Sequence, residues 1–260
     1  MRRIAGWIIQ YFQDCPEGLA DAFSQMKFGI AGAGGIGSNV AMLLARAGAS
    51  SLVLADFDTV EASNLNRQFY FADQVGRPKV EALAHNLHRI NGKLEIETRN
   101  MRLTRNNVCS VFEGCDFLIE AVDDSATKAF LIEEWSTGFP NGRIVACSGV
   151  AGTSGLSDIT TERTGNLSVV GDHHSTLEQG TFSAMVTAVA ASMVSEIYLL
   201  LTDDRCASCD GCKPGGVSLE CNGVKVPLIG FPAKMLENTV RGMVSSLKGA
   251  DPSGSIKIEI

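Results

Sequence analysis

A glycine-rich loop between an apolar segment and a helix-like segment constrains the fold of this chain more than any other feature. Phe28 to Ala31 has the composition of a short buried strand, and Gly-Ala-Gly-Gly-Ile-Gly follows it at residues 32–37. Apolar residues then recur at helical spacing, at Ile36, Val40, Leu43, Leu44 and Ala47. Leu52 to Leu54 form the next apolar segment, and Asp56 lies at its C-terminal end. This order predicts a strand, a tight turn, a helix and a second strand.

The loop has the G-x-G-x-x-G spacing that brings a phosphate close to the backbone. Glycines leave room for the phosphate, and the helix that begins there offers free N–H groups and the positive end of its dipole. An acidic residue about twenty positions later suits a ribose hydroxyl. We therefore predict nucleotide contacts at Gly32, Gly34, Gly35, Gly37 and Asp56, although the pattern does not indicate which nucleotide.

Apolar strands and helices alternate as far as residue 147, which is typical of an α/β fold with a Rossmann-like, doubly wound, mainly parallel sheet. Further strands are expected near residues 94–98, 117–121 and 144–147, and helices after Pro78, near residues 106–113 and after Ser125, the expected N-cap. The pattern changes after Gly155. Residues 159–164 and 167–170 predict an antiparallel continuation, and a long apolar helix follows from Thr181 to Leu201.

The pattern divides the chain into a main domain and smaller additions. Residues 1–26 are predicted to form a lead-in helix, 27–205 the main domain, 206–216 a cysteine-rich linker and 217–260 a small C-terminal unit. In this unit, two segments in which apolar and polar residues alternate flank Asn222-Gly223, which indicates a β-hairpin. A helix and a strand are expected after the hairpin. Such a ββαβ unit is short, so we expect it to pack on the main domain.

Composition and charge disfavour several partners and compartments. The net charge of −7 argues against nucleic acid or an anionic membrane surface as the main partner. The apolar segment Thr181 to Leu201 contains Glu196, so we interpret it as a packed helix and not as a membrane span. With eight cysteines in an acidic chain and no convincing signal peptide, we expect a cytoplasmic protein whose cysteines are thiols or metal ligands.

Four of the cysteines are candidate metal ligands. Cys206, Cys209 and Cys212 follow one another at C-x-x-C spacing, and Cys221 lies further along the chain. Their thiolates could bind a structural Zn²⁺ or an iron–sulfur centre. In the alternative interpretation, Cys221 joins the buried face of the predicted hairpin and none of the four binds metal. The sequence leaves both interpretations open.

Five short motifs occur in order along the chain. They are Gly32-Ala-Gly-Gly-Ile-Gly37, Asp56-Phe-Asp58, Asn64-Leu-Asn-Arg-Gln68, Gly76-Arg-Pro-Lys79 and Ala121-Val-Asp-Asp124. Together they resemble the ThiF/MoeB/HesA family of adenylating enzymes, relatives of the ubiquitin-activating enzymes, and most closely its short ThiF-type proteins. The resemblance covers roughly residues 27–202 and is far more specific than the glycine loop alone.

The resemblance implies that residues 27–205 form a ThiF-like domain that binds ATP and Mg²⁺ for attack of a carboxylate on the α-phosphate. It implies phosphate contacts from Arg67 and Lys79, triphosphate contacts from Asn64 and Gln68, a ribose contact from Asp56, a position near the sugar and phosphates for Asp58, and Mg²⁺ binding by Asp123. Arg67, Lys79 and Asp123 are then the catalytic residues. Taken singly, such charges are usually solvated, and Asp123 could instead cap a helix, although Ser125 can take that place.

The activity implied by the resemblance is ATP-dependent adenylation of the C-terminal carboxylate of a small β-grasp sulfur carrier ending in Gly-Gly, with release of pyrophosphate. The product would supply sulfur to thiamine or a related cofactor, with a cysteine desulfurase as a further partner and a homodimer as the assembly. The alternatives are adenylation of a small-molecule or tRNA-base carboxylate, a non-catalytic nucleotide-binding scaffold, and a NAD-dependent oxidoreductase. The set of Arg67, Lys79 and Asp123 argues against the scaffold. Neither Asn64 to Gln68 nor Lys79 has a role in hydride transfer, which argues against the oxidoreductase.

Two departures from the family pattern affect the mechanism. The resemblance implies that residues 171–182 cross the active site, where several family members carry a cysteine that takes the acyl group. Here the segment holds His173 and His174 and no cysteine. We therefore expect the reaction to stop at the acyl-adenylate, with Cys147 as the one strand-end cysteine that could change this expectation. Residues 1–26 also lack a clear version of the Arg-Gln motif of dimeric relatives.

Overall fold

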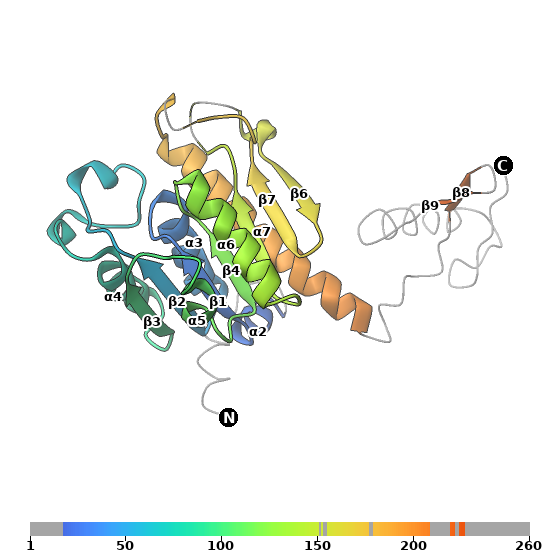
Figure 1. Cartoon of the computed structure of the whole chain (residues 1–260), viewed down its shortest axis with the longest axis horizontal. Coiled ribbons are helices and arrows are strands. Elements are labelled where there is room, and N and C mark those ends of the chain that lie inside the picture. Colours follow the sequence, from blue (N-terminus) through green and yellow to red (C-terminus); the bar gives the residue numbers. More distant parts are fainter. Residues whose placement is uncertain are drawn as a thin grey trace, which may run out of the picture. The chain divides into compact units, whose positions relative to one another are not determined.

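The structure, a computed structural model, describes residues 18–150, 152, 155–176, 179–208, 219–221 and 224–226. Seven strands form one sheet in the order β3-β2-β1-β4-β5-β7-β6 (Figure 1). Neighbouring strands are parallel except for β6 and β7, which are antiparallel. This arrangement confirms the predicted α/β class, with its doubly wound, mainly parallel sheet and antiparallel continuation.

The sequence of each strand matches its place in the sheet. The strands are β1 (Lys27–Ala31), β2 (Ser51–Asp56), β3 (Glu95–Asn100), β4 (Phe117–Glu120), β5 (Arg143–Cys147), β6 (Thr160–Thr164) and β7 (Leu167–Gly171). β1, β2, β4 and β5 are apolar and almost entirely buried, as expected for parallel strands covered on both faces. The edge strand β3 is mostly charged, polar and exposed, which discourages pairing with another chain.

Helices cover both faces of the sheet. They are α2 (Leu19–Ser24), α3 (Gly35–Ala47), α4 (Lys79–Ile90), α5 (Val108–Val111), α6 (Ser125–Gly138) and α7 (Ser183–Ser208), with 3-10 helices η1 (Ala62–Asn64), η2 (Ala72–Gln74) and η3 (Leu156–Asp158). α5 and α6 pack on one face, where Phe112 and Trp135 are completely buried. On the other face, Phe23 of α2 contacts Phe28 of β1 and Tyr198 of α7, with ring centroids 5.9 Å and 6.5 Å apart.

Helix α7 is joined to the antiparallel end of the sheet by a buried charge. Glu196 is 3% exposed and accepts two hydrogen bonds from Arg163 of β6, at 2.7 and 2.8 Å, and one from Ser168 of β7 at 2.7 Å. Ser183–Thr202 is long and apolar enough to cross a membrane, with a mean hydropathy of 1.8, but 50% of its apolar window is buried inside the protein. The ion pair to the sheet fits the predicted packed helix.

Some helix limits differ from the prediction. The N-cap of α6 is Asp124 and not Ser125, because the Asp124 carboxylate lies three residues before Thr127 and accepts its N–H at 2.7 Å. α5 is shorter than the expected 106–113, since it covers only Val108–Val111. α7 continues past Leu201 to Ser208, because no glycine or proline interrupts that stretch.

The chain divides into two compact units, residues 1–199 and 200–260. In the second unit, β8 (Leu219–Cys221) and β9 (Val224–Val226) pair antiparallel, with Cys221 opposite Val224, which agrees with the predicted hairpin. The predicted helix and last strand of the ββαβ unit lie outside the described residues, as does most of the lead-in helix. The proposed boundaries at residues 27, 206 and 217 therefore stay predictions.

Gly37→Ala is expected to destabilise the protein by about 3 kcal/mol or more, beyond the usual cost of overpacking. A Cβ atom at this position would lie 1.8 Å from the carbonyl oxygen of Gly32, so the backbone would have to move. Urea unfolding measures the loss. The matched control is Gly92→Ala, whose Cβ atom would lie 3.7 Å from the nearest atom, the carbonyl oxygen of His88. Equal stabilities of the two variants would contradict the described packing.

Candidate active site

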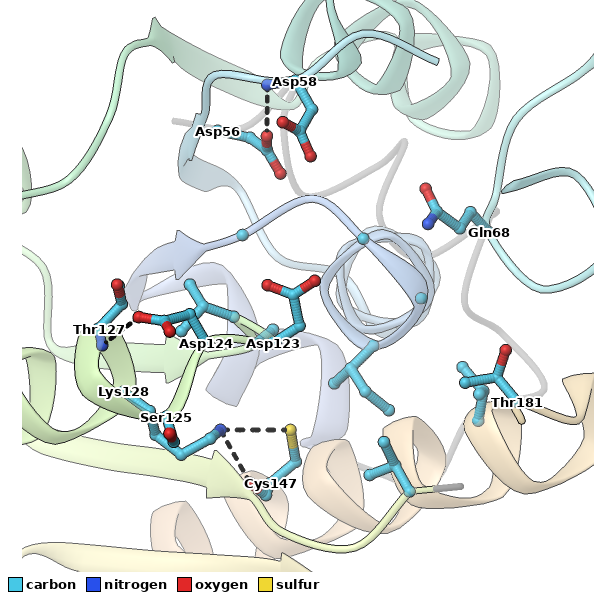
Figure 2. Close-up of a pocket in the computed structure, with 18 of the residues that line it drawn as sticks. Asp56, Asp58, Gln68, Asp123, Asp124, Ser125, Thr127, Lys128, Cys147 and Thr181 are labelled. Atoms are coloured by element: carbon cyan, nitrogen blue, oxygen red, sulfur yellow. Dashed lines mark hydrogen bonds between the residues drawn. The ribbon is translucent and has the colours of Figure 1, made fainter. Parts of the chain in front are cut away.

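A cavity of about 910 Å³ lies at the carboxyl ends of β1, β2, β4 and β5. Its wall includes the glycine loop, the segment after β2, the turn after β4 and the residues after β5 (Figure 2). The strand order reverses here, because β2 lies on one side of β1 and β4 on the other. In open α/β sheets, ligands bind at such a reversal.

The glycine loop connects β1 to α3 in the middle of this wall. Gly32 has a φ of +94°, and a Cβ atom there would lie 2.7 Å from the carbonyl oxygen of Ala121, so only glycine lets the loop lie against the end of β4. Gly34 and Gly35 line the cavity where α3 begins, and the free N–H groups of that end suit an anion. Gly37 does not line the cavity but packs against Gly32.

Asp56, at the end of β2, is held beside the glycine loop. Its carboxylate accepts a hydrogen bond from the N–H of Ala33 at 2.6 Å and another from the N–H of Asp58 at 2.8 Å. Asp56 and Asp58 both line the cavity (Figure 2). The two motifs that predicted a nucleotide, the glycine loop and the acidic residue after the second strand, are therefore brought into direct contact.

Lys79 reaches the cavity from the first turn of α4 and pairs with Asp58, with Nζ 2.8 Å from Oδ2. The lysine side chain is 8% exposed and the aspartate side chain 48%. A buried ammonium group needs a partner, whereas water can solvate a half-exposed carboxylate. An anionic ligand in the cavity can therefore replace Asp58 as the partner of Lys79.

Arg67 lies in the cavity wall and is tied to α3 through Asn39. The Asn39 amide donates hydrogen bonds to the carbonyl oxygens of Gly35 at 2.7 Å and Arg67 at 2.9 Å. The Arg67 guanidinium donates from Nη1 to the Ser63 carbonyl oxygen at 3.0 Å and to the Asn66 side chain at 2.8 Å. Because both bonds come from one of its three nitrogens, the guanidinium keeps donors for a ligand.

Gln68 lines the cavity, whereas Asn64 does not. The Gln68 amide oxygen is buried and has no hydrogen-bond partner among the described residues. Figure 2 shows this side chain at the cavity. Asn64, expected near the triphosphate, is buried instead, and its Oδ1 accepts the N–H of Glu61 at 3.1 Å. It shapes the η1 turn that precedes Arg67.

Asp123 projects into the cavity from the turn after β4 (Figure 2). Within the described part of the chain its carboxylate has no hydrogen bond or ion pair, and the adjacent Asp124 caps α6 in its place. Mg²⁺ usually binds through one or two carboxylates together with substrate phosphates, so this free carboxylate fits that ion. No group of three or more His, Cys, Asp or Glu side chains suited to an all-protein metal site occurs among the described residues.

A buried ion pair behind the cavity wall, which Lys128 lines and Glu120 does not, was not predicted. Glu120, the last residue of β4, is 0% exposed and pairs with Lys128 of α6. The Lys128 ammonium also donates to the Cys147 carbonyl oxygen at 2.9 Å and lies 3.9 Å from the Cys147 sulfur (Figure 2). Burial opposes the charge on Lys128, but Cys147 and Glu120 outweigh it and raise the lysine pKa. The only sequence signal was a glutamate ending an apolar strand.

A second contact that was not predicted lies at the β2 side of the cavity. The Arg102 guanidinium carbon lies 4.1 Å from the ring centroid of Phe57, and both residues line the cavity. The Phe57 side chain is 49% exposed, although large apolar side chains are normally buried. A flat cation–aromatic pair at the rim offers a surface against which a planar ligand group can stack.

The described part of the predicted crossing loop, residues 171–176 and 179–182, contributes hydroxyl groups to the cavity. Ser175, Thr176 and Thr181 line it, whereas His173 and His174 do not. The Nδ1 atom of His174 lies 2.6 Å from the carbonyl oxygen of Asp172, and His173 has a φ of +60°. The histidines therefore shape the loop and do not face the cavity.

The predicted metal ligands fall largely outside the described residues. Cys206 lies on α7 and Cys221 on β8, whereas Cys209 and Cys212 are not described. A zinc or iron–sulfur site at these cysteines therefore stays a prediction.

Cys147 is expected to be unreactive in the folded protein. Burial raises the pKa of its thiol to about 12, and the Glu120 carboxylate acts in the same direction. Since an ordinary thiol titrates near 8.5, we expect alkylation by iodoacetamide at pH 7.5 to be on the order of 10³-fold slower than for an exposed cysteine. Peptide mass spectrometry after timed alkylation measures this rate. The control is the same cysteine in urea, and equal rates in the two states would contradict the prediction.

Comparison with known proteins identifies the family. Residues 8–214 match the family model described as the ThiF family. The adenylyltransferase and sulfurtransferase MOCS3 of Aedes aegypti is 37% identical over 103 residues, which is 39% of this chain and 24% of that protein. The ubiquitin-like modifier-activating enzyme 5 of Drosophila ananassae is 47% identical over 75 residues, which is 29% of this chain and 19% of that protein. The chain thus spans about a quarter or less of these relatives.

Solved structures with the same fold include two Escherichia coli proteins. The tRNA N6-threonylcarbamoyladenosine dehydratase TcdA, also solved with ATP, superposes with a TM-score of 0.69 at 20% identity, over 76% of this chain and 95% of TcdA. MccB in complex with AMPCPP and MccA superposes with a TM-score of 0.58 at 21% identity, over 70% of this chain and 57% of MccB. At this identity the likeness establishes the fold alone. Since the family model covers most of its length, this chain belongs to the ThiF family.

Proposed function

We propose that this protein is an ATP-dependent adenylyltransferase that activates the C-terminal carboxylate of a small ubiquitin-like sulfur carrier and releases pyrophosphate. The observation that carries the proposal is the cavity at the strand-order reversal, where Arg67, Lys79 and a free Asp123 surround the glycine loop. Membership of the ThiF family supports it. The names of the relatives that match part of this chain, an adenylyltransferase and a ubiquitin-like modifier-activating enzyme, also support it.

ATP suits the cavity because positive groups meet where a triphosphate would lie. These are the N-terminus of α3, the Arg67 guanidinium and the Lys79 ammonium, which exchanges Asp58 for a phosphate oxygen. Asp56 accepts a ribose hydroxyl in the proposed complex. Asp123 would hold Mg²⁺, which when bound neutralises charge on the phosphate oxygens.

The chemistry requires two anions to react with each other. In the proposed reaction a carboxylate oxygen attacks the α-phosphorus, the bond from that phosphorus to the bridging oxygen breaks, and pyrophosphate leaves. The protein has to hold both anions in line and stabilise the charge that develops on the leaving group. Arg67 and Lys79 supply fixed positive charge for this purpose from two different segments, the loop after η1 and the start of α4.

A sulfur carrier ending in Gly-Gly is the proposed acyl substrate. The wall includes Ser148 and Gly149 after β5 and Ser175 after β7, small residues that suit a narrow, extended tail. The name of MOCS3, which joins adenylyl transfer to sulfur transfer, supports a carrier of sulfur as the substrate. Supply of that sulfur to thiamine or a related cofactor is part of the same proposal. TcdA is named for a tRNA modification, and its fold likeness favours a carboxylate on a tRNA base as the second candidate.

The reaction is proposed to stop at the acyl-adenylate on this protein. The Cys147 thiol stays protonated, and the described part of the crossing loop offers no cysteine for a covalent acyl-enzyme. The activated carrier then passes to a separate sulfur donor such as a cysteine desulfurase. A homodimer and a metal at the cysteine cluster belong to the same proposal.

Asp123→Asn is expected to lower carrier-dependent pyrophosphate release about 10²-fold or more, the scale of losing one preorganised group at a reacting centre. Its melting temperature should stay near that of the wild type, because the carboxylate has no partner among the described residues. The matched control is Asp124→Asn. Because asparagine is as good an N-cap as aspartate, this variant should keep its carrier-dependent pyrophosphate release. Arg67→Ala should lose activity on the same scale as Asp123→Asn.

Two outcomes would contradict the proposal. Near-wild-type release by both Asp123→Asn and Arg67→Ala would show that the site is wrongly assigned. Thermal stabilisation of the wild type by NAD but not by ATP with Mg²⁺ would show that the nucleotide is wrongly assigned.

A further inference from the structure

The turn that carries Asp123 leaves the sheet immediately after β4. The N–H of Ala121 still donates to the carbonyl oxygen of Ala31, at 2.9 Å, in continuation of the sheet. The next N–H, that of Val122, donates instead to Oε1 of the Glu120 side chain at 2.9 Å. The carboxylate of Glu120 thus replaces the neighbouring strand as acceptor directly before Asp123.

Lys128 holds this carboxylate in place. Its ammonium pairs with Oε2 of Glu120, the oxygen that does not bond Val122, and also donates to the Cys147 carbonyl oxygen at 2.9 Å. One lysine therefore joins the ends of β4 and β5 to the first turns of α6. Figure 2 shows the Asp123 carboxylate pointing away from Lys128, so the lysine does not neutralise Asp123.

This pair differs from the other lysine–carboxylate pair of the cavity. Asp58 is 48% exposed and can release Lys79 to a ligand, because water solvates the freed carboxylate. The Glu120 side chain is 0% exposed, so loss of Lys128 would leave a buried carboxylate without an opposite charge. The Glu120–Lys128 pair therefore stays closed, and its role is to hold the turn after β4 in one conformation.

We propose that Glu120 and Lys128 are positioning residues that aim the Asp123 carboxylate at the cation bound with the nucleotide. The inference rests on the proposed function, in which Asp123 binds Mg²⁺ together with ATP. Without Lys128, the Glu120 carboxylate keeps only its hydrogen bonds from the backbone N–H groups of Val122 and Cys147, and burial favours its neutral form. The Val122 N–H then loses a charged acceptor, and the turn can rotate. Asp123 remains in the chain but no longer meets the cation at the required place.

The test is a double-mutant cycle on nucleotide binding by the full chain. Isothermal titration with ATP, in Mg²⁺ and in EDTA, gives the factor by which Mg²⁺ tightens ATP binding. Lys128→Met is expected to reduce this factor by about 10–100-fold, the usual effect of removing a group that orients a metal ligand. In an Asp123→Asn background the same change should have no further effect. Lys128→Arg should keep most of the Mg²⁺ factor.

Asp58→Asn serves as the matched control, because it breaks the exchangeable pair. It should change ATP affinity by the same factor with and without Mg²⁺. If Asp58→Asn and Lys128→Met instead give the same pattern, Lys128 acts on the phosphates and the positioning role is wrong.

A second variant separates positioning from stability. Glu120→Met with Lys128→Met removes both charges, and such replacements are often neutral or stabilising for the fold. We expect this protein to fold and still to lack the Mg²⁺ factor, because the Val122 N–H has no acceptor. Recovery of the Mg²⁺ factor together with stability would overturn the inference.

The outcomes also separate the inference from the proposed function. If the wild type shows no Mg²⁺-dependent ATP binding, the proposed function fails first. If Asp123→Asn loses the factor while Lys128→Met keeps it, only the inference fails.

Discussion

The close approach of the glycine loop to the end of β4 is the constraint on which the rest of the site depends. Gly32 can occupy its position only without a side chain, since a Cβ atom would lie 2.7 Å from the Ala121 carbonyl oxygen. This approach brings the N-terminus of α3, which suits a phosphate, next to the turn that carries Asp123. It also places the loop beside β2, where Asp56 accepts the Ala33 N–H at 2.6 Å. Three of the five motifs in the sequence thus meet at the glycine loop.

Burial then assigns different roles to the charges around this contact. Lys79 is buried but its partner Asp58 is half exposed, so the pair can open when an anion arrives. Lys128 has a completely buried partner, so that pair stays closed and fixes the turn after β4. Asp123 has no partner among the described residues and is free for a cation. One site thus combines a lysine whose carboxylate partner a ligand can replace, a lysine that stays paired, and a carboxylate that is free to bind a cation.

Much of the fold could be predicted from the sequence, because buried parallel strands are continuous apolar runs and the glycine loop has a characteristic spacing. The motifs also identified the cavity residues Arg67, Gln68, Lys79 and Asp123. They could not show which motif side chain faces the cavity, so Asn64 was expected at the ligand and instead bonds the Glu61 N–H. Asp124 and Ser125 are equally good caps by type, and only the geometry of the turn selects Asp124. The Glu120–Lys128 pair depends on contacts with β5, which no local pattern predicts.

The central claim is that this cavity joins the α-phosphate of ATP to a carboxylate, and ATP–pyrophosphate exchange tests it most directly. The protein is incubated with ATP, Mg²⁺, labelled pyrophosphate and a sulfur carrier ending in Gly-Gly, and with the same carrier lacking its last glycine. We predict that label enters ATP only with the intact carrier and only with Mg²⁺. Absence of exchange with intact carriers, while ATP with Mg²⁺ still binds, would contradict the claim for a protein carboxylate. Exchange that requires tRNA instead would assign the chemistry to the second candidate.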